Sequence, residues 1–318
     1  MKRRVLSLML GLTILCSVVL SGCEQGEKAG GGPSVPNSPT ISDEAPDTNP
    51  TAEPEIVQPE QEPAVYTYET QELYAQRDGN QIYGVIYVPQ DAGETMPAVL
   101  YAHGYGVTHQ NGVQYAERLA AAGYVVYCFD FCGGGNSSQS DGSPLEMSIF
   151  TEQADLEAVL EMVRELDYVD PENVFLFGAS QGGLVSGITA AAHVDEVRGL
   201  ILLYPGFEIV EEAQARFATA EEIPDTYAMF GWMTVGRAYF EPLLDYDPYS
   251  VIGAYDKDVL LIHGDSDGIV NISSSQRALE VYPSAELKVL EGAGHGLSGA
   301  TAELATQYML EYLGAHVG

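Results

Sequence analysis

The sequence has 318 residues, 46% of them hydrophobic, so it is long enough and apolar enough to bury a full core in one large domain or two small ones. Its 13 Lys and Arg residues stand against 46 Asp and Glu residues, which gives a net charge of −33 at pH 7. Such a charge repels the phosphates that a nucleic-acid binder must neutralise, which argues against nucleic acid as a partner and predicts a solvated surface.

The first residues have the layout of a secretory signal. Lys2, Arg3 and Arg4 precede an apolar run over 5–20, which is too short to span a membrane comfortably. Residues 20–23, Leu-Ser-Gly-Cys, resemble a bacterial lipobox. This resemblance implies that residues 1–22 are removed and that Cys23 carries the lipid, such as palmitate, which would hold the protein at a membrane outside the cytoplasm. An ordinary secretory signal with an incidental cysteine is the alternative.

Residues 24–63 consist mainly of Gly, Pro, Ser, Thr, Asp and Glu, with almost no aromatic or branched apolar side chain to bury. This composition predicts that 23–63 is a lipid-anchored, disordered tether. A coil of about 40 residues has an r.m.s. length of roughly 35 Å. The folded domain is therefore expected to be 64–318.

Strand and helix signals alternate after the tether. Two strand-like stretches, 66–74 and 81–88, flank Asp78-Gly79, a hairpin turn signal. Short apolar runs then alternate with stretches of helical spacing, which predicts a mostly parallel sheet with helical crossovers. The expected strands are 98–102, 124–129, 174–177, 200–204, 259–262 and 287–290, and the expected helices include 115–122, 156–163, 184–192 and 301–313.

A long interval between the strands ending at Tyr204 and starting near Val259 interrupts this alternation. Its main part, at about 206–250, is rich in aromatic residues and is interpreted as an inserted lid or binding element. Within it, Met229, Phe230 and Trp232 are the candidate substrate-binding residues. The alternative is a packed helical subdomain without a role in substrate contact.

Residues 178–183, Gly-Ala-Ser-Gln-Gly-Gly, follow the strand 174–177 and run into the small-residue helix 184–192. This is the context of a nucleophile elbow, a turn so tight that only glycines fit beside the serine. The turn would expose the hydroxyl of Ser180 above the sheet, and the helix N-terminus would favour an oxyanion there.

A nucleophilic serine needs a base and a carboxylate that orients the base. His295, in a glycine-rich loop before the last helix, is the only histidine placed well for the base. For the acid, Asp267 is preferred to Asp265, which stands close to the strand end and is interpreted as a capping or turn residue. A calcium loop is not expected, because Ile269 stands where such a loop needs an oxygen ligand.

The expected oxyanion hole combines two backbone amides. His103-Gly104-Tyr105 follows the strand 98–102, in the loop that supplies the second donor beside an elbow. The amides of Tyr105 and Gln181 are the predicted donors, and His103 is expected to pack under the loop.

Two cysteines, Cys128 and Cys132, remain after Cys16 leaves with the signal and Cys23 takes lipid. Their spacing on a strand and its exit, roughly 13 Å at strand rise, is too long for a bridge and wrong for a zinc pair, so buried free thiols are expected. No metal or organic cofactor is expected.

From about Tyr66 to the C-terminus these motifs together resemble the α/β-hydrolase superfamily, which implies a mostly parallel central sheet with helices on both faces and an inserted lid segment. The loop at 103–105, the elbow at 178–182 and the insertion resemble the cinnamoyl and feruloyl esterases. Tyr105 and Cys132 depart from that type, since relatives commonly have another aromatic residue and an arginine or similar polar residue there.

The resemblance implies a serine hydrolase for small-molecule carboxylic esters. Ser180 would form an acyl-enzyme, His295 would transfer the proton, and Asp267 would fix the imidazole. Two alternatives stay open: a serine peptidase of aminoacyl or dipeptidyl type with the same fold, and a non-catalytic surface binding protein, although no member of the triad is missing.

Overall fold

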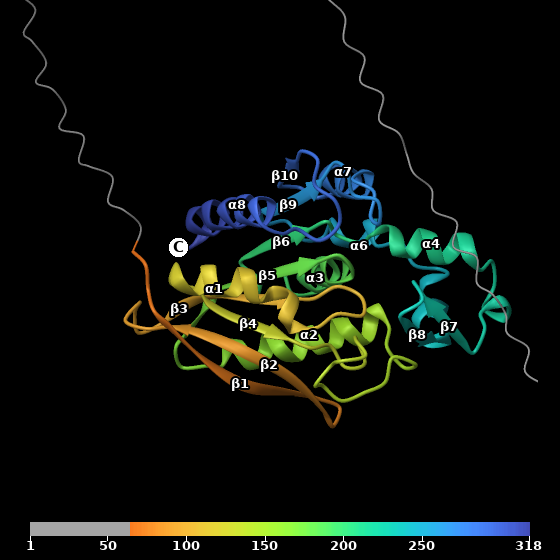
Figure 1. Cartoon of the computed structure of the whole chain (residues 1–318), viewed down its shortest axis with the longest axis horizontal. Coiled ribbons are helices and arrows are strands. Elements are labelled where there is room, and N and C mark those ends of the chain that lie inside the picture. The colour runs from red at the N-terminus through yellow and green to blue at the C-terminus, as the bar shows by residue number, and fades with distance from the viewer. Residues whose placement is uncertain (1–63) are drawn as a thin grey trace, which may run out of the picture. The chain divides into compact units, whose positions relative to one another are not determined.

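The structure is a computed structural model that describes residues 64–318 (Figure 1). The predicted signal peptide, Cys23 and the tether lie outside the described residues. The strands are β1 (Tyr68–Arg77), β2 (Asn80–Pro89), β3 (Met96–Ala102), β4 (Val125–Phe129), β5 (Val169–Ala179), β6 (Gly199–Leu203), β7 (Thr226–Met229), β8 (Met233–Gly236), β9 (Val259–Gly264) and β10 (Ala285–Leu290). The α-helices are α1 (Val113–Ala121), α2 (Ile149–Arg164), α3 (Gln181–Ala192), α4 (Glu208–Arg216), α5 (Arg237–Phe240), α6 (Tyr249–Ile252), α7 (Ser273–Val281) and α8 (Ala300–His316).

Eight strands form one sheet in the order β1-β2-β4-β3-β5-β6-β9-β10. The pairs β1·β2 and β2·β4 are antiparallel and the other neighbours are parallel. Asp78 and Gly79, both with positive φ, turn β1 into β2 as expected. The expected mostly parallel central sheet is confirmed.

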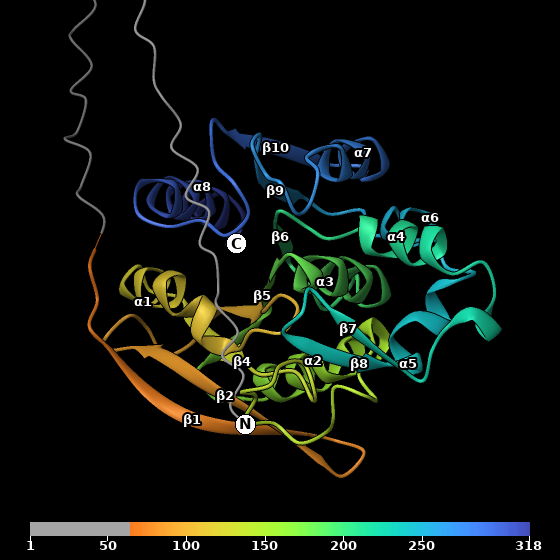
Figure 2. The ribbon, with the colours of Figure 1, turned by 45° about the vertical axis from the view of Figure 1, so that its right-hand side comes forward.

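Helices cover both faces of this sheet. Figures 1 and 2 show α1 and α8 together on one face and α2 and α3 on the other, with α6 beside α3 and α7 beside α6. The side chains of β4 and β6 are buried at every position, because each strand contributes to one hydrophobic core on either face. Because these strands are buried on both faces, their sequences are continuous apolar runs.

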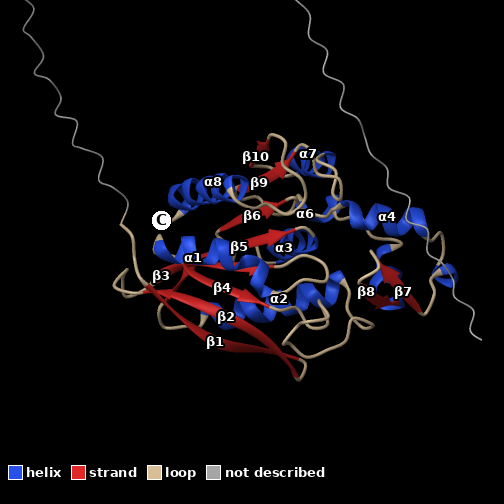
Figure 3. Cartoon of the chain, viewed as in Figure 1, coloured by secondary structure: helices blue, strands red, loops and turns tan. Residues whose placement is uncertain are grey.

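The insertion between β6 and β9 is of mixed structure. It contains α4, α5, α6, two short 3₁₀ turns and the antiparallel hairpin β7·β8, whose strands form a small sheet of their own (Figure 3). Phe230 and Gly231, both with positive φ, lie in the hairpin turn. The insertion therefore differs from the helical subdomain of the alternative by this hairpin, and its role in substrate contact stays a prediction.

The carboxyl ends of the parallel strands meet at one edge of the sheet. The loops after β3, β5, β6, β9 and β10 start there, and they contain all the residues predicted for the triad and the oxyanion hole. Ligands of open α/β sheets bind at this edge.

Cys128 and Cys132 are buried free thiols, as expected. Among the helices of 64–318, none is long and apolar enough to cross a membrane.

Candidate active site

Ser180 lies in the tight turn between β5 and α3, with φ of 55° and ψ of −122°. A non-glycine residue at positive φ is strained, so the surrounding contacts must hold it. The Ser180 N–H donates to the carbonyl of Leu203 (3.0 Å), and the Ser180 carbonyl accepts from the N–H of Gly206 (2.8 Å). No larger residue fits at position 182, because a Cβ there would overlap the backbone carbonyls of Ala102 and His103.

Three predicted side chains form one chain of hydrogen bonds. His295 Nε2 lies 3.1 Å from Ser180 Oγ, and His295 Nδ1 lies 2.8 Å from Asp267 Oδ2. The ring of Tyr204 packs on the imidazole with 4.5 Å between centroids. Because ionised Asp267 can only accept, Nδ1 carries the proton and Nε2 is left to accept from the serine hydroxyl.

The carboxylate of Asp267 is fully buried but well paired. Its Oδ1 accepts from the N–H groups of Ile269 (2.8 Å) and Val270 (3.0 Å), and its Oδ2 faces His295. Burial raises the pKa of Asp267, but these bonds outweigh burial, so its pKa lies below the ordinary value. The carboxylate therefore stays ionised at neutral pH.

Asp265 and His263 lie near the site and have other partners. The carboxylate of Asp265 accepts from the N–H of Gly292 (2.7 Å) and joins two loops at the surface. His263 is buried between the Val270 carbonyl (3.0 Å from Nε2) and the Ser275 hydroxyl (2.7 Å from Nδ1), and burial lowers its pKa. A neutral His263 can donate from Nε2, which also lies 3.4 Å from Asp267 Oδ2.

Two backbone N–H groups beside Ser180 are unpaired. Those of Tyr105 and Gln181 have no acceptor within residues 64–318. Gly104 lies directly against the Ser180 side chain. The buried ring of His103 holds this loop, because Nδ1 bonds the Gly104 carbonyl (2.8 Å) and Nε2 accepts from the N–H of Phe131 (3.0 Å).

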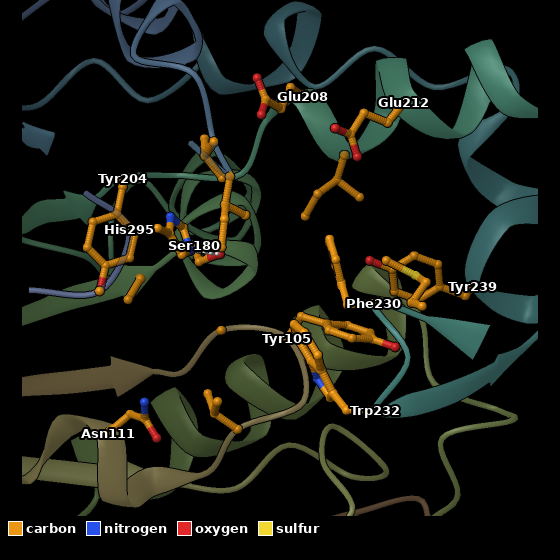
Figure 4. A pocket seen from close by; sticks show the side chains of 18 of the residues that line it. Tyr105, Asn111, Ser180, Tyr204, Glu208, Glu212, Phe230, Trp232, Tyr239 and His295 are labelled. Carbon is orange, nitrogen blue, oxygen red and sulfur yellow. Dashed lines mark hydrogen bonds between the residues drawn. The ribbon is translucent and has the colours of Figure 1, made fainter. Parts of the chain in front are cut away.

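A cavity of about 220 Å³ opens beside Ser180 and His295 (Figure 4). The hairpin β7·β8 contributes Met229, Phe230 and Trp232, the residues predicted from the aromatic insertion. The rings of Phe230 and Trp232 are stacked at 5.0 Å. Most of the lining is apolar, which is typical of small-molecule sites.

The lining residues that the sequence interpretation missed include Tyr204, Glu208, Glu212 and Tyr239. Tyr239 belongs to the aromatic set of the insertion, so its composition could have indicated it. The two glutamates lie on α4 opposite the hairpin (Figure 4). Their sequence pattern alone indicates an ordinary solvent-exposed helix face. Burial raises the pKa of Glu208.

No group of three or more His, Cys, Asp or Glu side chains between 64 and 318 is arranged to hold a metal ion.

Comparison with known proteins finds similarity to a hydrolase family and to a lipase. Residues 93–236 match the hydrolase family described as serine aminopeptidase S33. The quorum-quenching protein AidA of Acinetobacter baumannii is 32% identical over 114 residues, which cover 35% of this chain and 36% of that protein. The monoglyceride lipase of Saccharomyces cerevisiae is 26% identical over a region covering 74% of this chain and 90% of the lipase.

Solved structures share the whole fold of the described domain. Est1E from Butyrivibrio proteoclasticus, solved with bound ferulic acid, superposes with a TM-score of 0.71 at 25% identity and covers 77% of this chain and 98% of Est1E. DcsB, in complex with its substrate analogue, gives a TM-score of 0.66 at 21% identity, over 78% of this chain and 100% of DcsB.

Proposed function

We propose that the chain is a member of the α/β-hydrolase superfamily and a serine esterase that cleaves small carboxylic esters through an acyl-enzyme on Ser180. The observation that supports this proposal most strongly is the chain of hydrogen bonds from Ser180 through His295 to Asp267, next to the cavity. A serine hydroxyl paired with a base, which is paired with a buried carboxylate, is the arrangement that activates a nucleophile.

In the proposed reaction, Ser180 Oγ bonds to the ester carbonyl carbon while His295 Nε2 takes the hydroxyl proton. The carbonyl oxygen becomes an oxyanion, which the free N–H groups of Tyr105 and Gln181 stabilise. His295 then gives its proton to the leaving alkoxide and the C–O bond breaks. Water then attacks the acyl carbon while Nε2 takes one of its protons. Nε2 returns this proton to Ser180 Oγ as the bond from Oγ to the acyl carbon breaks, which releases the acid and restores the serine. Asp267 stabilises the imidazolium in both halves.

The lining of the cavity supports a substrate of low polarity. Tyr105, Phe230 and Trp232 give it an aromatic wall, and its carboxylates are Glu208 and Glu212. Carboxylates at the cavity disfavour anionic substrates. We therefore infer neutral esters with an apolar or aromatic acyl group, a class that fits the monoglyceride lipase and the ferulate-binding Est1E among the similar proteins.

Hydrolysis of p-nitrophenyl esters with acyl chains of increasing length tests the proposal. We expect turnover by the wild type and a loss of at least about 10⁴-fold in Ser180→Ala. Ser186→Ala is the matched control, because Ser186 is a buried serine of α3, the helix that follows Ser180, and its hydroxyl has no partner within 64–318. Equal rates for wild type and Ser180→Ala would reject the mechanism.

A serine aminopeptidase is the second candidate, favoured by the description of the matching family and by Glu208 and Glu212 at the cavity. These carboxylates could pair with the ammonium group of an aminoacyl substrate. Aminoacyl p-nitroanilides and neutral p-nitrophenyl esters, assayed in parallel, separate the two. A preference for the anilides that Glu212→Gln removes would favour the peptidase.

A further inference from the structure

A buried chain of side-chain hydrogen bonds lies behind the candidate oxyanion hole. The side chain of Gln181, the residue after Ser180, has two partners: its Nε2 donates to Glu152 Oε2 (2.8 Å), and its Oε1 accepts from the hydroxyl of Tyr239 (2.7 Å). Gln181, Glu152 and Tyr239 are all fully buried. Both ends of the Gln181 amide are therefore fixed.

The partners of Gln181 belong to different parts of the domain. Glu152 lies in the first turn of α2, which a reciprocal capping box of Ser148 and Thr151 holds in place. Tyr239 lies in α5 of the insertion. Through one amide, the insertion is joined to the nucleophile elbow and to a helix that packs on the central sheet.

The insertion also contacts the second residue of the candidate oxyanion hole. The hydroxyl of Tyr105 donates to the carbonyl of Met233 in β8 (3.3 Å), and the ring of Tyr105 packs against the ring of Tyr239 with 6.0 Å between centroids. Figure 4 shows Tyr105 and Tyr239 close together on the side of the cavity formed by the hairpin. Both residues of the candidate oxyanion hole thus have side-chain contacts with the insertion.

Burial favours the neutral form of Glu152, although the hydrogen bond from Gln181 acts in the opposite direction. Burial raises its pKa well above the ordinary value, and the neighbouring carboxyl of Asp155 raises it further. Its Oε1 has no partner within residues 64–318. An ionised carboxylate here would oppose the negative charge that develops at the oxyanion, whereas the protonated acid holds Gln181 without adding charge.

We propose that the insertion positions the oxyanion hole, with Tyr239 and Glu152 as positioning residues that act through the side chain of Gln181. The inference rests on the proposed esterase function and assigns the insertion a role beyond forming the pocket wall. The backbone N–H of Gln181 is the group whose direction these contacts control.

A positioning role makes a specific kinetic prediction. Oxyanion donors interact more strongly with the transition state than with the ground-state carbonyl, so misplacing one lowers kcat and leaves KM nearly constant. Removing a whole donor costs about 10² to 10³ in kcat. A misdirected donor should cost less, roughly 5- to 20-fold.

The first experiment removes one hydroxyl group. Tyr239→Phe should lower kcat on a p-nitrophenyl ester roughly 5- to 20-fold, keep KM within about twofold, and weaken a trifluoromethyl ketone transition-state analogue by the same factor as kcat/KM. Tyr255→Phe is the matched control, because Tyr255 is equally buried and its hydroxyl bonds one carbonyl, that of Val197, away from the cavity. Tyr239→Phe with wild-type kcat and inhibitor affinity would overturn the inference.

The second experiment asks whether the effect passes through Gln181. Gln181→Met keeps the backbone N–H but removes both side-chain bonds, so Tyr239→Phe should cost no more than about twofold further in that background. Glu152→Gln keeps a neutral acceptor and should retain near wild-type kcat, whereas Glu152→Leu should lose as much as Gln181→Met. Additive losses, or equal losses in both Glu152 variants, would contradict the inference. A wild type that hydrolyses no ester would instead refute the proposed function.

Discussion

At the scale of single residues, the two aspartates of the loop after β9 can be distinguished by their partners. Asp267 bonds His295, while Asp265 bonds the backbone of Gly292. Asp267→Asn should lower kcat by about 10⁴-fold, because the imidazole loses its tautomer control and its counter-charge. Asp265→Asn should cost about 1 kcal/mol of stability and little turnover.

Both variants should be measured on one aryl ester, with folding checked by circular dichroism. An inactive Asp265→Asn beside an active Asp267→Asn would reverse the assignment of the acid.

Glu152 leads to a prediction about stability and pH. Unfolded, its carboxyl titrates near 4.5, whereas burial raises its pKa in the folded protein, so the fold retains a proton that the unfolded chain loses. The stability that depends on this proton is fully present below pH 4.5 and falls as pH rises above it, by at most about 1.4 kcal/mol per pH unit. Because glutamine has no titrating proton, Glu152→Gln should remove this pH-dependent loss of stability.

The free energy of unfolding of Glu152→Gln, minus that of the wild type, should therefore grow from pH 4.5 to pH 7 in urea titrations. Other titrating groups are present in both proteins and cancel in the difference. A pH-independent difference would show that Glu152 is ionised in the fold.

How well sequence identifies a site residue depends on whether its role is local. Ser180, Asp267 and His295 follow strand ends in a fixed order, so motif and position were enough to bring together three residues that the structure joins by hydrogen bonds. The proposed positioning roles of Glu152 and Tyr239 could not be predicted, because each depends on a contact with Gln181, which is distant in sequence.

At the scale of elements, the aromatic hairpin β7·β8 should control the acyl preference. Trp232 lines the cavity but is 54% exposed, so its removal should enlarge the acyl side at little cost in packing. Trp232→Ala should move the preferred p-nitrophenyl ester toward longer chains while the melting temperature changes by less than about 2 °C.

Val289→Ala is the control for this change, since Val289 is similarly exposed on β10 and does not line the cavity. A chain-length profile unaltered by Trp232→Ala would assign the hairpin to packing alone.

The elements that sequence predicted well are those buried on both faces. The apolar runs of β4 and β6 have no competing interpretation, and their observed bounds lie within one residue of the predicted ones. The hairpin β7·β8 was not predicted, because its strands have only four residues each and pair with each other outside the main sheet. Such short strands lack the alternation that marks a strand.

At the scale of the whole molecule, we propose that the protein is held at a membrane outside the cytoplasm by lipid on Cys23. The sequence Leu-Ser-Gly-Cys at 20–23 and the polar stretch after it support this proposal, although both lie outside the described residues. The full-length wild type should sediment with membranes, and Cys23→Ser should not. Wild-type protein recovered entirely in the soluble fraction would refute the anchor.

The central claim is that Ser180 is a nucleophile activated by His295. Intact-mass spectrometry after treatment with a fluorophosphonate tests it most directly, because the reagent phosphonylates only a serine that a neighbouring base activates. We expect one adduct per chain, mapped to Ser180 by peptide sequencing, no adduct in Ser180→Ala, and labelling at least about 10³-fold slower in His295→Ala. A wild-type protein that stays unlabelled, or an adduct at a different serine, would contradict it.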